Sequence, residues 1–85
     1  MVYDVSMIPE SNQKAFIEAG YTMQSNAFVK VEDSVSFVAT FRNQNPAFFE
    51  IRIDGDEKGF AAILASNSVT ANAIYDAEVT AHSMP

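Results

Sequence analysis

The chain has 85 residues, of which 48% are apolar and 19% charged; this is too apolar for intrinsic disorder and predicts one compact domain over residues 1–85. It contains no cysteine, which excludes disulfide frameworks and thiolate metal sites. Its net charge of −6 is repelled by nucleic-acid phosphates and by acidic membrane surfaces, so we expect no direct binding to either.

The beginning of the chain predicts a strand followed by a helix. Residues 2–7 alternate between apolar and polar side chains, which is the period of a half-buried strand. Pro9 ends this pattern and suits a first helical turn, and Gly20 suits the position just after a helix. We therefore expect a strand over residues 2–7 and a short helix over residues 9–19.

Three segments of strand-like composition follow, at residues 27–32, 35–42 and 47–54. The turns that join them, at residues 33–34 and 43–46, are short and rich in turn-forming residues, so neighbouring strands should pair as antiparallel hairpins. The residues predicted to face the core are Val29, Val31, Val35, Phe37, Phe41, Phe49, Ile51 and Ile53.

The last third of the chain contains an apolar run and a helical pattern. Residues 60–65 are six apolar residues, and their period does not distinguish a strand from a helical turn. Gly59 favours a short buried strand, with a helical turn leading into the last helix as the alternative. From Ser68 onward apolar residues recur at helical spacing, and the last four residues, 82–85, are expected to fray.

Together these elements predict an α+β fold, in which two helices pack on one face of a small antiparallel meander sheet. The sheet should have three to five strands, in the order β-α-β-β-β-(β)-α along the chain. The start of the sequence lacks the basic segment of a secretory signal, and no apolar run is long enough to span a membrane. We therefore expect a cytoplasmic protein.

No motif for catalysis or metal binding is visible in the sequence. The single histidine, His82, lies in the expected C-terminal tail, and no Gly-x-Ser-x-Gly motif marks a nucleophilic serine. Residues 54–59 begin like a calcium-binding loop, but Lys58 and Ala65 occupy positions that require oxygen ligands. The sequence therefore predicts no enzyme activity, no catalytic residue, no metal and no cofactor.

The first candidate binding surface is acidic. Alternate turns of a meander lie at the same end of the sheet, so the turn at residues 33–34 should adjoin the turn that follows residue 53. We expect these turns to form either an acidic rim for Arg or Lys of a partner protein, or a set of solvated turns. This acidic rim consists of Glu32, Asp33, Asp54, Asp56 and Glu57.

The second candidate surface is the sheet face that points away from the helices. Three apolar side chains are expected there among polar neighbours, which is typical of the centre of an interface. A partner protein, a second copy of the chain or the first strand would cover them. This apolar sheet face consists of Phe28, Val38 and Phe48.

These features indicate a small acidic module that binds another protein with a basic surface. Small acidic domains without motifs resemble the inhibitors that bacteriophages and mobile elements direct against host machinery, anti-CRISPR proteins among them. The resemblance rests on size, charge and absent motifs, and it implies an inhibitor that occupies a nucleic-acid-binding surface in the host cytoplasm. The alternatives are a structural protein that forms a homodimer or larger oligomer through its open sheet face, and a small-molecule-binding domain.

Overall fold

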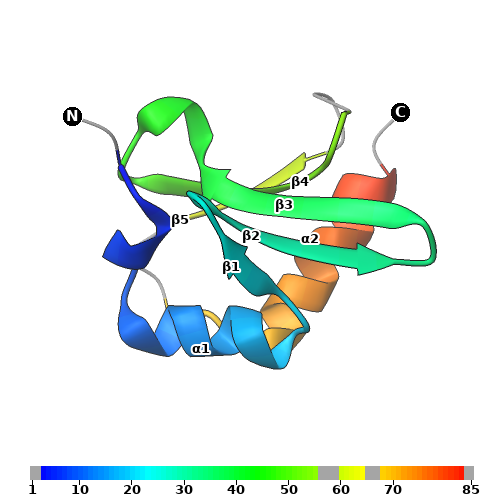
Figure 1. Ribbon diagram of the computed structural model, residues 1–85, viewed down its shortest axis with the longest axis horizontal. Coiled ribbons are helices and arrows are strands. Elements are labelled where there is room, and N and C mark those ends of the chain that lie inside the picture. The colour runs from blue at the N-terminus through cyan, green and yellow to red at the C-terminus, as the bar shows by residue number, and fades with distance from the viewer. Residues whose placement is uncertain (1–2, 56–59, 65–67, 84–85) are drawn as a thin grey trace.

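The computed structural model describes residues 3–55, 60–64 and 68–83, and over these residues the α+β class and the antiparallel meander are confirmed (Figure 1). Five described strands stand in the order β1-β2-β3-β4-β5, and both α-helices lie on one face of the sheet. The elements are η1 (Val5–Met7), α1 (Glu10–Glu18), β1 (Thr22–Gln24), β2 (Ala27–Glu32), β3 (Val35–Phe41), η2 (Arg42–Gln44), β4 (Phe48–Ile53), β5 (Phe60–Leu64) and α2 (Ala71–Ser83).

Helix α1 forms where the sequence predicts it. Pro9 stands at the N-cap, and Glu10 in the first turn interacts favourably with the helix dipole. The chain leaves the helix through Gly20, whose φ of +101° is a conformation that other residues rarely adopt. A Cβ added at Gly20 would lie 3.3 Å from the Lys30 side chain, so this position favours glycine on two grounds.

The strand predicted over residues 2–7 is wrong. Val5–Met7 form a 3₁₀ turn, which Asp4 caps by accepting a backbone N–H two residues on at 2.9 Å. Val5 donates its own N–H to Asn26 Oδ1 at 3.0 Å, and its side chain is fully buried. This segment is therefore held by a side chain and a buried valine instead of by a neighbouring strand.

The sheet contains the three predicted central strands and one strand that the sequence analysis missed. Residues 60–64 form β5, which settles the choice between strand and helical turn in favour of the strand. The missed strand is β1, which pairs with the start of β2 across a two-residue turn at Ser25 and Asn26. Because β1 has only three residues, its sequence shows no usable alternation.

The turn between β2 and β3 determines which side of β2 faces the core. Asp33 and Ser34 both have positive φ, at 50° and 65°, which is the pattern of a type I′ hairpin turn. This turn pairs Glu32 with Val35. Residues that pair across an antiparallel hairpin point to the same face, so the even-numbered residues of β2 share the core face of β3.

This register corrects the predicted core face of β2. Phe28 is fully buried and Lys30 is 8% exposed, whereas Val31 is 69% exposed and Val29 is only partly buried. The core positions predicted on β3 and β4 are confirmed, since the side chains there are buried or packed against the core: Val35, Phe37, Phe41, Phe49, Ile51 and Ile53.

Aromatic rings form the centre of the core between the sheet and the helices. Phe16 of α1 stacks on Phe28 with ring centroids 5.1 Å apart. It also meets Tyr21 and Phe49 edge to face, at 5.3 Å and 5.4 Å. Ile74 of α2 is fully buried in the same cluster. One ring of α1 therefore packs against β2, β4 and the segment that precedes β1.

The register of β2 can be tested with two substitutions on the same strand. Phe28→Ala should lower the free energy of unfolding by about 3–5 kcal/mol, because it leaves a cavity in the core. Val31→Ala removes an exposed side chain and should change that free energy by less than about 0.5 kcal/mol. Urea unfolding followed by circular dichroism measures both values, and equal losses would contradict the register.

Candidate functional site

The described part of the acidic rim lies at the end of the sheet where two connections meet. Glu32 and Asp33 lead into the β2–β3 turn. Asp54 begins the connection after β4, and its backbone N–H donates to a β3 carbonyl oxygen at 2.8 Å. The structure thus brings these three exposed acids to one end of the sheet. The other predicted members of the rim, Asp56 and Glu57, lie outside the described residues.

The three described acids of the rim differ in their partners. Glu32 Oε2 lies 3.0 Å from Lys30 Nζ, and Asp54 Oδ1 lies 3.9 Å from Arg52 Nη1. Asp33 has no cation within 4.0 Å over residues 3–55, 60–64 and 68–83. Within the described part of the rim, Asp33 is therefore the carboxylate most available to a partner.

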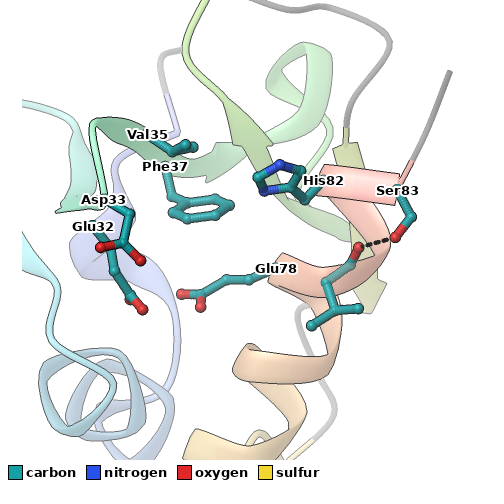
Figure 2. A pocket seen from close by; sticks show the side chains of 8 residues that line it. Glu32, Asp33, Val35, Phe37, Glu78, His82 and Ser83 are labelled. Carbon is teal, nitrogen blue, oxygen red and sulfur yellow. Dashed lines mark hydrogen bonds between the residues drawn. The ribbon is translucent and has the colours of Figure 1, made fainter.

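A cavity of about 320 Å³ lies beside the rim, between the β2–β3 hairpin and the end of α2 (Figure 2). The hairpin contributes Glu32, Asp33, Val35 and Phe37, and the helix contributes Glu78, Val79, His82 and Ser83. The lining therefore combines carboxylates with apolar side chains, which is the composition expected of a site for a cation with an apolar stem.

His82 belongs to the last turn of α2. The turn is closed by Ser83 Oγ, which donates to the carbonyl oxygen of Val79 at 2.8 Å. His82 is exposed and lines the cavity. Within the described residues, no group of three or more His, Asp or Glu side chains is arranged to hold a metal ion.

A buried polar cluster adjoins the cavity through Glu78. Lys30 Nζ donates to the two carboxylate oxygens of Glu78 at 3.1 Å and 2.9 Å, and to the carbonyl oxygen of Ala19 at 3.0 Å. The Tyr21 hydroxyl donates to Glu78 Oε2 at 2.6 Å. Lys30 Nζ also lies 5.4 Å and 5.2 Å from the ring centroids of Tyr21 and Tyr75. The cluster links β2, α2 and the segment that follows α1.

Sequence reasoning missed this cluster, although two signals pointed to it. The two-residue turn at Asp33–Ser34, taken with a core-facing Phe37, already places Lys30 on the core face. Ile74, Glu78 and Ala81 stand four and three residues apart, which is the spacing of one helix face. Lys30 therefore follows the buried Phe28 on the core face of β2, and Glu78 lies between the buried Ile74 and Ala81 on one face of α2.

The cluster raises the pKa values of Lys30 and Tyr21. Burial opposes the charged form of Lys30, but hydrogen bonds to Glu78 and Glu32 outweigh it, so the pKa of Lys30 lies above its ordinary value. Burial, together with the hydrogen bond to Glu78 and its negative charge, raises the pKa of Tyr21 far above its ordinary value. Both groups are therefore protonated in the folded chain at neutral pH.

The predicted apolar sheet face differs from the structure in one member. Phe28 is fully buried in the core, so it is not available for binding. Val38 and Phe48 do lie on the sheet face opposite the helices, where Val38 is partly buried and Phe48 is 40% exposed. Val31, which is more exposed than either, lies on the same face in the register of β2 and β3.

Both arginines of the chain line a second, polar cavity of about 370 Å³, together with Asn43 and Glu50. Arg42 Nη1 lies 2.8 Å from Glu50 Oε2, and Arg52 Nε lies 3.9 Å from Glu50 Oε1. The Glu50 side chain is only 12% exposed. Two guanidinium groups and one carboxylate leave the lining of this cavity net positive, opposite in sign to the cavity beside the acidic rim.

Comparison of the chain with protein-family models, curated proteins and solved structures found no match. Within the described residues, no helix is both long and apolar enough to cross a membrane. A proposal for the function therefore depends on the charges, cavities and exposed side chains described above.

The contribution of the buried ion pair to stability can be measured by removing first one charge and then both. Lys30→Met should lower the free energy of unfolding by about 3–5 kcal/mol, because it leaves the Glu78 carboxylate buried without its cation. Adding Glu78→Gln should recover most of that loss, since Gln is uncharged and still accepts from Tyr21. Urea unfolding at neutral pH measures both effects. No recovery in the double variant would show that packing, and not the unpaired charge, causes the loss.

The raised pKa values of Lys30 and Tyr21 predict a loss of stability in alkali. Their ordinary values are 10.5 and 10.0, so between these values and the higher folded ones the folded chain binds more protons than the unfolded chain. Stability is therefore fully present below about pH 10 and falls as the pH rises above it. The urea midpoint should be lower at pH 11 than at pH 8, and Tyr21→Phe should make this decline shallower. A midpoint that does not change with pH would contradict the prediction.

Proposed function

We propose that this chain is a non-enzymatic protein-binding module that docks its acidic end on a basic surface of a partner protein. The acidic end comprises the described acids of the rim, Glu32, Asp33 and Asp54, and the cavity beside them. The observation that carries the proposal is that Asp33 and Glu32 line a cavity together with apolar side chains. Opposite charges increase the rate of encounter, and apolar contacts that exclude water lower the rate of dissociation. The acidic end offers both within one small area.

Within this class, inhibition of the partner is the role that the charge supports best. Surfaces that bind nucleic acid are basic, and a domain with a net charge of −6 is attracted to them. A bound acidic module would exclude the nucleic acid by occupying the same surface. The chain would then act like the phage and mobile-element inhibitors that its size and charge resemble, in the cytoplasm of the host.

A second candidate function is that of an assembly protein, because the sheet face opposite the helices carries exposed apolar side chains. Val31 is 69% exposed and Phe48 is 40% exposed on that face. A second copy that covers them would bury apolar area on both chains. The mass in solution would then be a multiple of 9.3 kDa.

The proposed binding should depend on salt and on the acids of the rim. The tagged chain should capture one stoichiometric partner from host lysate at about 50 mM salt and lose it at about 500 mM, because salt screens charges at the interface. Asp33→Lys combined with Asp54→Lys should then slow association with that partner by at least about tenfold, as expected for a steered encounter. Stopped-flow mixing measures the association rate.

The matched control places the same charge change on α1. Glu10→Lys combined with Glu18→Lys gives the same net charge, and both residues are exposed. This control should leave the association rate within about twofold of the original chain. An equal decrease in both double variants would mean that only net charge matters. Recovery of the bait alone, as a discrete oligomer, would contradict the proposed binding and favour the assembly protein.

A further inference from the structure

The cavity at the acidic end has a negative wall. Among the described residues, its lining carboxylates, Glu32, Asp33 and Glu78, exceed the adjacent ammonium group of Lys30 by two negative charges. The last turn of α2 also lines the cavity, and the C-terminal end of a helix carries a partial negative charge. His82, the remaining titratable group of the lining, is exposed on that turn. The cavity therefore favours a cationic guest.

The three lining carboxylates differ in whether they are already paired with a cation. Lys30 Nζ lies 3.0 Å from Glu32 Oε2 and 2.9 Å from Glu78 Oε2, so it already binds these two carboxylates. Figure 2 shows Glu78 directed from α2 toward Glu32, and Asp33 beside Glu32 on the hairpin. Asp33 is the lining carboxylate without a cation among the described residues. A guest cation should therefore bind at Asp33.

The apolar wall identifies the kind of cation. Val35, Phe37 and Val79 line the cavity, and Val79 is 65% exposed, so a guest that covers it removes apolar surface from water. A metal ion gains nothing from such a wall, whereas a cation on a methylene stem does. The planar guanidinium group of arginine presents two parallel N–H donors that match the two oxygens of a carboxylate, whereas the ammonium group of lysine is a compact, strongly hydrated point charge.

We propose that this cavity receives an arginine side chain of the partner protein, with its guanidinium group on Asp33 and its stem along Val35 and Val79. A volume of about 320 Å³ is at the lower end of the range for ligand pockets, and it admits one side chain with its adjacent backbone. The inference rests on the proposed function, because it names the group by which the partner is held.

The test uses the full chain, labelled with ¹⁵N, and three capped tripeptides as probes. Acetyl-Gly-Arg-Gly-amide should shift the amide signals of residues 33–37 and 78–83, with a Kd in the range of about 1–10 mM, as expected for a single side chain. The peptide with citrulline, which has nearly the same shape without the charge, should bind at least about tenfold more weakly. The peptide with lysine should bind more weakly than the arginine peptide.

Variants of Asp33 and Val79 then test the carboxylate and the apolar wall of the site separately. Asp33→Asn should weaken binding of the arginine peptide by about five- to tenfold, because it removes a charge-assisted hydrogen bond. Val79→Ala should weaken it by about two- to threefold, because less apolar surface is covered. The control Glu10→Gln removes one exposed negative charge at the start of α1, outside the cavity, and should leave Kd unchanged.

The results separate this inference from the proposed function. Equal binding of the arginine and citrulline peptides, or signal shifts away from the cavity, would overturn the arginine site. Equal binding of the lysine peptide would overturn the preference for arginine. If the peptides fail but the rim variants still slow association with the partner, the arginine site is wrong and the proposed function stands. If the arginine peptide binds in the cavity but partner capture does not depend on salt, the site stands and the proposed function fails.

Discussion

The buried ion pair between Lys30 and Glu78 determines how α2 sits on the sheet. Either charge alone would be costly to bury, so the register of β2 and the rotation of α2 must bring both to the same point. Tyr21 and the carbonyl oxygen of Ala19 complete the hydrogen bonds of the pair, which ties the end of α1 to the same place. Because Glu78 also lines the cavity, the shape of the acidic end depends on this buried contact.

Most of the sheet could be predicted from the sequence, because alternation in β3 and β4 and the short turns between strands are local signals. The side of β2 that faces the core was predicted wrongly, although the turn at Asp33–Ser34 contains that information. The apolar side chains of Val29 and Val31 outweighed the turn, since a lysine on the core face looks unfavourable without a known partner. That partner, Glu78, is 48 residues away, so no pattern within β2 could identify it.

Only part of the candidate site could likewise be predicted from the sequence. Turn chemistry placed Glu32, Asp33 and Asp54 at one end of the sheet, because alternate turns of a meander share an end. Turn chemistry does not show which of these acids is paired: Glu32 and Asp54 each have a cation two residues earlier in the chain, Lys30 and Arg52, whereas the residue two before Asp33 is Val31. Likewise, the 3₁₀ turn at Val5–Met7 depends on a bond to Asn26, which alternation within the segment cannot reveal.

The short length of β1 has a consequence for aggregation. β1 pairs only with residues 27–29 of β2, so residues 30–32 extend past it along the edge of the sheet. Such an edge is a template on which a strand of another chain can add, and the exposed Val31 would favour that addition. A charged side chain that points inward from an edge strand is one of the features that protect natural sheets from it. Lys30 occupies this position, so the residue that pairs with Glu78 in the core is also of the type that disfavours strand addition at this edge.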